Sequence, residues 1–260
     1  MDIRLNRRKL EYTVGEDYTT SDSYATLFFW GDVHLGHPAC DLDKAKHNLQ
    51  FAIDHRFNIL LMGDLLECAT RNSVGDGVYI QKLNPQEQME QMIDILKPAV
   101  EAGLVLGSHS GNHCARIQKD TGIDIMKLMC RELKIPYLGS ACWNLFRVGQ
   151  QNYTVYSMHG SSGSRFFYTK LKSLADISHN FRADIIACGH THELATEATV
   201  EQFIDLRSQT VQERKKYLVL TGSYLKYDDT YAQAKGYPMS KTGSPNIKLE
   251  MTAHRIHFRD

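Results

Sequence analysis

The sequence predicts an α/β protein built as a four-layer αββα sandwich, in which two mixed β-sheets are flanked by helices. Short apolar runs alternate with longer amphipathic segments in the first half of the 260-residue chain, and a hairpin with further strands fills the second half. Strands that alternate with helices favour a parallel arrangement with the helices on the faces of the sheet.

Three apolar runs in the first half end at a glycine and are too short for helices, which predicts strands. They span residues 24–30, 59–62 and 104–106. Residues 44–57 and 85–100 space their apolar side chains at intervals of three and four, and Pro85 suits the first position of a helix. Because loops after the carboxyl ends of parallel strands gather in one crevice, residues in those loops should lie together.

The second half changes character. A hairpin is expected from residues 143–148 and 152–158, with residues 149–151 as its turn. A helix over residues 167–179 then leads to a strand over residues 184–188. Later strands are expected over residues 196–204, 216–221 and 247–257, which gives the second sheet.

Composition favours one domain over residues 21–260, preceded by an N-terminal arm over residues 1–20. With 42% hydrophobic and 23% charged residues, the chain has the material for a buried core. Thirty basic and thirty acidic side chains cancel, so extended binding along a nucleic-acid duplex is not favoured. The arm carries Arg4, Arg7, Arg8 and Lys9, which we interpret as a solvated tail rather than a phosphate contact.

The six cysteines show no CxxC pair and no close spacing, which favours a reducing compartment. The N-terminus lacks an apolar signal-type segment, and no run approaches the roughly 20 apolar residues of a membrane span. We therefore expect a cytoplasmic protein without membrane contact.

Five short segments that carry metal-type ligands recur in order, each at the end of an apolar run. They are Gly31-Asp32-Val33-His34, Gly63-Asp64, Gly111-Asn112-His113, His159-Gly160 and Gly189-His190-Thr191-His192. Their mixed oxygen and nitrogen donors suit a pair of divalent cations better than a thiolate-rich structural zinc site. Since His190 and His192 are two residues apart, a bend at Gly189 is expected to bring both side chains to one place.

This order of motifs resembles that of the calcineurin-like metallophosphoesterase superfamily, over residues 32–192. The resemblance implies that one metal is held by Asp32, His34 and His192, and the other by Asn112, His159 and His190. Asp64 would bridge the two. His37, which extends the first motif, is not expected to be a ligand.

A dinuclear centre explains why these residue types occur together. Two cations about 3.5 to 4 Å apart share a hydroxide, lower its pKa and clamp the phosphoryl oxygens for in-line attack. The cofactors implied are two divalent ions, with manganese favoured and iron, zinc or magnesium as alternatives.

By the same resemblance His113 is a catalytic residue rather than a ligand, acting on charge or on the leaving oxygen as an imidazolium. Glu67, three residues after Asp64, is the candidate carboxylate that raises the pKa of His113. Relatives commonly carry Asp at that position, and they carry Asp or Glu where this chain has Cys114. These two departures affect the surroundings of the catalytic histidine and remove no metal ligand.

Substrate contacts are less specific. Arg116 is a candidate phosphate contact, with a salt bridge as the alternative, and Arg165 is another, with an ordinary loop as the alternative. Possible substrate-rim segments are residues 68–84 and residues 224–246. The second contains Tyr224, Tyr227, Tyr231 and Tyr237, which either stack on a nucleobase or pack onto the core.

These observations predict a metal-dependent phosphoesterase, a hydrolase that uses a metal-bridging hydroxide. Phosphodiester substrates, such as a nucleotide or a nucleic-acid end, are slightly favoured, which would make the protein a phosphodiesterase or nuclease. The alternatives left open are a phosphomonoesterase or protein phosphatase, and a noncatalytic scaffold that retains the fold. Protein partners are not predicted.

Overall fold

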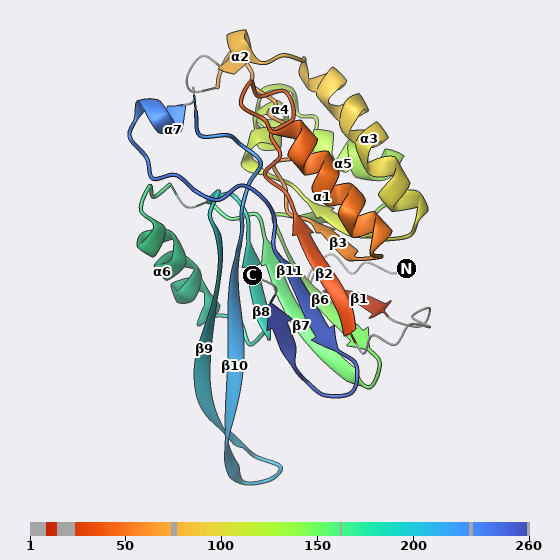
Figure 1. The fold of residues 1–260 in the computed structure, drawn as a ribbon, viewed down its shortest axis with the longest axis vertical. Coiled ribbons are helices and arrows are strands. Elements are labelled where there is room, and N and C mark those ends of the chain that lie inside the picture. Colours follow the sequence, from red (N-terminus) through yellow and green to blue (C-terminus); the bar gives the residue numbers. More distant parts are fainter. Residues whose placement is uncertain (1–8, 15–23, 74–76, 162, 229–230, 259–260) are drawn as a thin grey trace.

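Two six-stranded β-sheets pack face to face, with helices on both outer surfaces (Figure 1). This arrangement, seen in a computed structural model, confirms the predicted αββα sandwich of two mixed sheets. The structure describes residues 9–14, 24–73, 77–161, 163–228 and 231–258.

The first sheet, called sheet I, has a parallel centre and an antiparallel edge. Its strands, in spatial order, are β12 (Ile256–Phe258), β11 (Asn246–Glu250), β2 (Tyr24–Trp30), β3 (Asn58–Leu61), β4 (Val105–His109) and β5 (Tyr137–Gly139). Strands β2 to β5 run parallel to one another, whereas β11 runs antiparallel to both β2 and β12. The carboxyl ends of β2, β3 and β4 therefore lie at one edge.

The second sheet, sheet II, is also mixed. Its spatial order is β1 (Lys9–Val14), β6 (Ala141–Val148), β7 (Gln151–Met158), β8 (Ile185–Cys188), β10 (Thr210–Thr221) and β9 (Leu194–Asp205). Strands β7 and β8 run parallel and end beside each other, so the residues that follow them are neighbours. The β9–β10 hairpin extends well beyond the rest of the molecule (Figure 1).

Helices cover the outer faces of the two sheets. Those on sheet I are α1 (Leu42–Asp54), α3 (Pro85–Glu101) and α5 (Ile125–Glu132), and α6 (Phe167–Ser178) covers sheet II. The remaining helices are α2 (Gly77–Ile80), α4 (Asn112–Thr121) and α7 (Tyr231–Ala234), which lie at the upper end in Figure 1. Among the described residues, no helix is long and apolar enough to cross a membrane.

Strand β2 illustrates how the sequence makes these layers. Leu27 and Phe29 pack into the core between the sheets, whereas Phe28 and Trp30 pack into the core under the helices. Successive side chains of a strand point to opposite faces, so a continuously apolar strand must be covered on both sides.

Several predicted elements are confirmed. The strand over residues 24–30 has the predicted bounds, and the helix expected over residues 85–100 is α3. Its N-cap is Asn84, which accepts hydrogen bonds from the backbone of the first turn while the Glu87 carboxylate accepts one from the Asn84 N–H. The turn of the β6–β7 hairpin is shorter than expected, because β7 already begins at Gln151.

The single strand predicted over residues 247–257 is wrong, since the chain reverses there and forms β11 and β12. The buried hydroxyl of Tyr153, from sheet II, lies at the centre of this reversal. It donates to the Glu250 carbonyl oxygen (2.7 Å) and accepts from the Arg255 N–H (3.0 Å). A contact between sheets therefore ends a segment that periodicity alone extends.

Part of the segment predicted as an N-terminal arm, over residues 1–20, is described by the structure. Lys9–Val14 form β1, which pairs in parallel with β6 at the edge of sheet II. Arg4, Arg7 and Arg8 lie outside the described residues.

Asp184, just before β8, should contribute measurably to stability. The buried carboxylate accepts hydrogen bonds from the backbone N–H (2.7 Å) and hydroxyl (2.6 Å) of Thr154 and from Arg214 (2.9 Å). Burial opposes the charged form, but the interactions with His254, Thr154 and Arg214 hold the pKa of Asp184 well below its usual range. Asp184→Asn should therefore cost about 1–3 kcal/mol at neutral pH, because hydrogen bonds to a charged group are lost.

The pH dependence has a definite sign. A carboxylate with a lowered folded-state pKa stabilises the protein above its unfolded pKa of about 4, and that stabilisation is lost as the pH falls toward the folded value. The difference in urea unfolding free energy between wild type and Asp184→Asn should thus shrink between pH 7 and about pH 3. Asp94→Asn, at an exposed site on α3, is the matched control. A constant difference across that range would contradict the prediction.

Candidate metal centre

The five motif segments come together at the upper end of the two sheets in Figure 1. Asp32 follows β2, Asp64 follows β3, and Asn112 begins α4 after β4. His159 and His190 follow the parallel strands β7 and β8 of sheet II. The site therefore lies where the carboxyl ends of strands from both sheets meet.

The backbone at most of these positions is left-handed. The φ angles are 48° at Asp32, 52° at His34, 44° at Asp64, 63° at His190 and 56° at His192. Non-glycine residues avoid this region because the Cβ atom approaches the following carbonyl, at a cost of roughly 1–2 kcal/mol each. Such conformations persist where surrounding structure enforces them, commonly at functional sites.

The bend expected at Gly189 is therefore made by His190 and His192 themselves. Gly189 serves a different need, because a Cβ atom there would lie 2.9 Å from Asp32 Oδ2. The glycine lets the carboxylate of Asp32 approach the backbone, and the His190 N–H donates to Oδ1 (3.1 Å) and Oδ2 (3.0 Å) of that carboxylate.

One cluster of ligand atoms joins the first and last motifs. The Nε2 atoms of His34 and His192 lie 3.0 Å apart. Asp32 Oδ1 is 3.4 Å from His192 Nε2 and 3.9 Å from His34 Nε2. Asp32 and His34 are buried and His192 is partly exposed, so the cluster opens to solvent on the His192 side.

A second cluster joins the middle motifs. His159 Nε2 lies 3.1 Å from Asp64 Oδ2 and 3.0 Å from Asn112 Oδ1. His190 completes the group with its ring centroid 5.3 Å from that of His159. His159 Nδ1 faces the Met62 carbonyl oxygen (2.9 Å), which orients Nε2 toward the cluster.

Asp64 belongs to both parts of the site. Its ligand atoms lie within 4.8 Å of those of His159 and His190, and also within that distance of His34 and His113. Asp64 Oδ2 is buried, and His159 Nε2 is its charged neighbour at 3.1 Å. A buried carboxylate needs an opposite charge, which either a protonated His159 or a bound cation supplies. The donor set thus fits divalent cations.

Protonation of these groups reflects the concentration of charge. Burial opposes the charge on His159, yet Asp64 and Asp32 raise the pKa of His159 to about 9. Burial and nearby His113 lower the pKa of His34 to about 4. A ligating imidazole is neutral, so a cation and a proton compete for His159 Nε2.

Glu67 and His113 lie together, as the sequence proposed. His113 Nδ1 is 3.0 Å from the Glu67 carbonyl oxygen and 3.1 Å from Glu67 Oε2, while the same Oε2 is 3.1 Å from His34 Nδ1. Burial opposes protonation of His113, but the interaction with Glu67 and the charge of Asp64 raise the pKa of His113. The longer side chain of Glu67 thus reaches two histidines at once.

The two predicted arginines lie on different sides. Arg116, on α4, places one guanidinium nitrogen 3.0 Å from His113 Nε2 and the other 3.4 Å from Glu67 Oε1. Arg165 lines a cavity beside His190 and His192, with its guanidinium carbon 4.9 Å from the centre of the Phe166 ring. Arg116 therefore contacts His113, whereas Arg165 does not take part in that contact.

Cys114 is buried in the core under the helices. Its hydrogen bond with Cys68 and its burial raise the pKa of the Cys114 thiol well above the ordinary value. The residue after the Gly-Asn-His motif thus packs as an apolar side chain.

Sequence reasoning passed over Glu193, which directly follows the last motif. This buried carboxylate accepts from Lys170 (2.8 Å) and from Ser240 (2.6 Å), linking α6 and the segment after β10 to the metal-type histidines. Its adjacency to His192 was the available signal. Tyr224, considered above as a stacking residue, is fully buried and its ring centroid lies 6.1 Å from that of Trp30, so it packs onto the core.

Gly111→Ala should disrupt the centre without removing a ligand. A Cβ atom there would overlap Asp64 Oδ1, at 1.9 Å, and the Asp64 backbone nitrogen, at 2.4 Å. We expect displacement of Asp64 and loss of bound manganese, measured by metal analysis after gel filtration.

Gly122→Ala provides the control at the other end of α4. Gly122 has φ of 76° and nothing within 4 Å of an added Cβ. It should cost about 1–2 kcal/mol of stability through backbone strain and retain the metal. Equal metal content in Gly111→Ala and wild type would contradict the proposed crowding.

Comparison with family models finds no match, and none of the curated proteins matches. Solved structures do match. A metallophosphoesterase from Sphaerobacter thermophilus is 16% identical, with 90% of this chain and 86% of that chain covered and a TM-score of 0.41. A predicted phosphoesterase from Streptococcus pneumoniae is 10% identical, with 90% and 88% covered and a TM-score of 0.40.

Vps29 from Entamoeba histolytica, in complex with zinc, is 16% identical, with 90% of this chain and 97% of that chain covered and a TM-score of 0.37.

Proposed function

We propose that the chain is a dinuclear metal-dependent phosphoesterase. The observation that carries this proposal is the buried Asp64 carboxylate, which lies in reach of both histidine clusters. A carboxylate with two oxygens and a negative charge suits a bridging position between two cations. Asp32, His34 and His192 would hold one cation, and Asn112, His159 and His190 the other.

The cations, when bound, supply Lewis-acid stabilisation of the phosphoryl oxygens and activation of the attacking water. Manganese is our first choice, with iron, zinc and magnesium as alternatives, since a histidine and carboxylate set accepts each of them.

His113 is the proposed catalytic acid. Because Nδ1 faces Glu67, Nε2 is the atom that would transfer a proton to the leaving oxygen, which would take the place that a guanidinium nitrogen of Arg116 holds at 3.0 Å. Glu67 acts through His113, by keeping the ring oriented and favouring its protonated form. Arg116 places its planar fork beside His113, where it would bind a phosphoryl oxygen.

Phosphodiesters remain the favoured substrates. A diester carries a second substituent, and a cavity beside His190 and His192 offers space for one. Phosphomonoesters, including phosphoproteins, are the alternative.

The test is a side-by-side assay of bis-p-nitrophenyl phosphate and p-nitrophenyl phosphate with manganese, magnesium, zinc or a chelator. We expect metal-dependent release of p-nitrophenolate, faster from the diester. Faster cleavage of the monoester would favour the phosphomonoesterase reading. Protein that binds two manganese ions and cleaves neither ester would point to a noncatalytic scaffold.

A further inference from the structure

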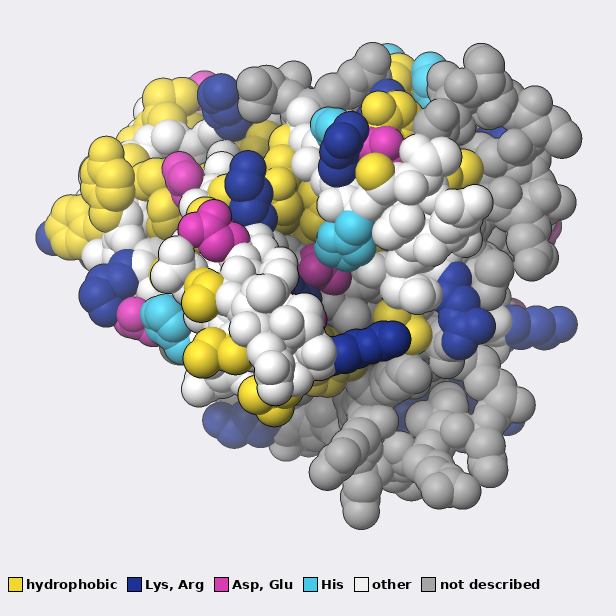
Figure 2. Space-filling model, turned by 90° about the horizontal axis from the view of Figure 1, so that it is seen from below, with side chains coloured by type: hydrophobic (Ala, Val, Ile, Leu, Met, Phe, Trp, Pro, Cys, Tyr) yellow, Lys and Arg dark blue, Asp and Glu magenta, His cyan; other side chains and the backbone are white. Residues whose placement is uncertain are grey.

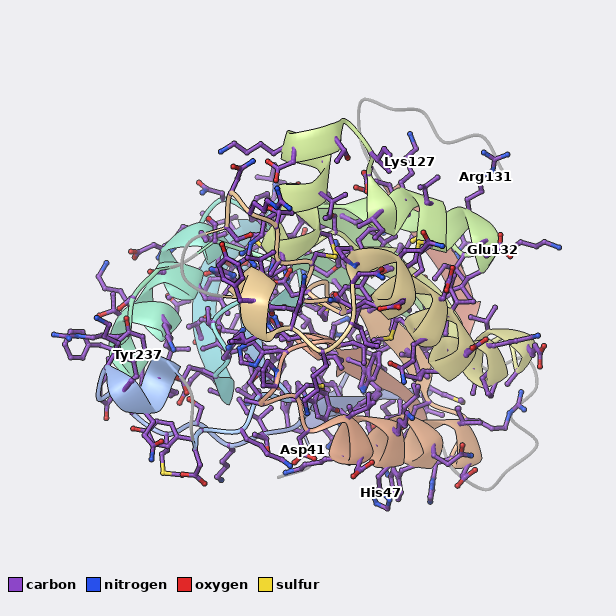
Figure 3. The ribbon with its side chains drawn as sticks, turned by 90° about the horizontal axis from the view of Figure 1, so that it is seen from above. Asp41, His47, Lys127, Arg131, Glu132 and Tyr237 are labelled. Carbon is purple, nitrogen blue, oxygen red and sulfur yellow. The ribbon has the colours of Figure 1, made fainter. Side chains whose placement is uncertain are left out.

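A cavity of about 320 Å³ adjoins the histidines of the last motif. Its lining includes His192 on the side of the metal centre, together with Arg165, Leu225, Lys226, Tyr227 and Tyr237. Figure 3 places Tyr237 beside α7, on the side of the molecule where α6 lies and away from α5. The cavity is thus built by residues that follow β7, β8 and β10, together with His37 after β2.

The walls of this cavity are tied to the metal centre. The Tyr224 N–H donates to the Asp32 carbonyl oxygen (3.0 Å), and the Lys226 N–H donates to the Ala39 carbonyl oxygen (2.9 Å). Glu193 accepts from both Lys170 and Ser240, which joins α6 to the far wall. These bonds hold the cavity in place relative to the first and last motifs, so a ligand meets a largely formed site.

The chemistry of the lining is aromatic and cationic. Tyr227 donates from its hydroxyl to the Tyr237 carbonyl oxygen (2.8 Å), which fixes the segment that carries both rings. Lys170 is paired with Glu193 at 2.8 Å. Lys226 is 59% exposed and forms a weak surface pair with Asp41 at 3.8 Å. Aromatic faces with nearby cations suit a base and the phosphates attached to it.

The size of the cavity narrows the choice of ligand. A volume of about 320 Å³ is at the low end of small-ligand sites, so it accommodates one substituent rather than a folded partner. The lower face of the molecule, opposite the end that carries the cavity, shows both basic and acidic side chains among the described residues (Figure 2).

We propose that this cavity binds the nucleoside of a phosphodiester whose phosphate lies at the metal centre, with Tyr237 stacking on the base. The proposal rests on the function proposed above and specifies its substrate as a nucleotide diester. Arg165 and Lys226 line the same cavity, where they would donate to oxygens of the bound nucleoside.

Two p-nitrophenyl diesters with the same leaving group test this assignment. One is the p-nitrophenyl ester of thymidine 5′-phosphate and the other is methyl p-nitrophenyl phosphate, so only the retained substituent differs. With manganese, wild type should show a kcat/KM at least about tenfold higher for the thymidine ester. Tyr237→Ala should reduce the ratio of the two kcat/KM values at least about fivefold, as loss of one base–aromatic stack does.

Tyr237→Phe keeps the ring and should retain the ratio. Tyr168→Ala is the matched control, since Tyr168 is 82% exposed on α6 and does not line the cavity. Equal kcat/KM values for the two esters in wild type, or an unchanged ratio in Tyr237→Ala, would overturn the nucleoside assignment and leave the phosphoesterase proposal intact.

Failure of wild type to hydrolyse either ester would instead overturn the proposed function. In that case calorimetric titration with thymidine 5′-phosphate tests whether the cavity binds a nucleoside. Binding that weakens in Tyr237→Ala would support the assignment, and absence of binding would overturn it.

Discussion

Asp64→Asn is expected to abolish metal-dependent hydrolysis while leaving the fold intact. Replacing one carboxylate oxygen by an amide nitrogen removes the charge that both clusters share, while the remaining oxygen can still accept from the His113 N–H. Removing a residue that only orients a metal ligand typically lowers metal affinity or activity about 10–100-fold. Loss of a bridging ligand itself should therefore reduce kcat/KM by more than about 100-fold. Bound manganese should fall from two ions per chain to one or none.

The measurements are the rate of bis-p-nitrophenyl phosphate cleavage and the metal content of the purified protein. Asp94→Asn makes the same chemical change at an exposed site on α3 and should match wild type in both. Circular dichroism and the unfolding temperature establish that the variant is folded. A folded Asp64→Asn protein with the wild-type rate would refute the metallohydrolase proposal.

Glu67→Gln should have the second-largest effect, and it should change the shape of the pH profile. The amide is nearly isosteric but cannot supply the negative charge that favours the protonated ring of His113. Rates should fall about 10–100-fold, as for other partners that orient catalytic or ligating histidines.

The direction of the shift follows from the role of His113. An acid must be protonated, so activity falls as the pH rises through its pKa, and a lower pKa moves this alkaline limb of kcat/KM to lower pH. The same Oε2 lies near His34 Nδ1, so manganese affinity is measured in parallel. Glu90→Gln, at an exposed site on α3, controls for the chemical change. An unchanged rate with an unchanged pH profile would end the assignment of Glu67 as the partner of His113.

The elements best predicted from sequence are those in which local pattern and burial agree. Residues 24–30 are continuously apolar and form a strand covered on both faces, and Asn84 with Pro85 starts α3 where the pattern begins. Helices α4 and α5 had no such local prediction. They follow the Gly-Asn-His motif as short amphipathic segments, and they are defined by the packing of α4 against α5 and of α5 against β4 and β5.

The site shows the same division. The order of the motifs allowed the ligands to be assigned through the family resemblance, and the structure brings those residues into two adjoining clusters. The sequence did not reveal that His190 and His192 themselves make the bend. A positive φ at a non-glycine residue persists only where the surrounding structure holds it. His109, which no motif includes, is a buried histidine whose ring nitrogens face the Gly139 carbonyl oxygen and the Ser157 hydroxyl.

The rim tyrosines show why such distinctions need three dimensions. Tyr224 and Tyr237 belong to one aromatic segment, yet Tyr224 is fully buried and Tyr237 lines the cavity. Composition reports that a segment is aromatic, whereas burial depends on which elements pack against it.

By itself, the sequence determined the alternation of strands and helices, the positions where strands end, and the residue types available for metal ligation at those ends. These features follow from local periodicity and from side-chain chemistry, and both depend only on residues that are close together in the sequence. Tertiary structure decided which strands became neighbours, where residues 247–257 reverse, how Glu67 contacts two histidines, and which tyrosine faces a cavity. Those outcomes depend on contacts between residues far apart in the chain. Such contacts contribute to the free energy only after the two sheets have packed together.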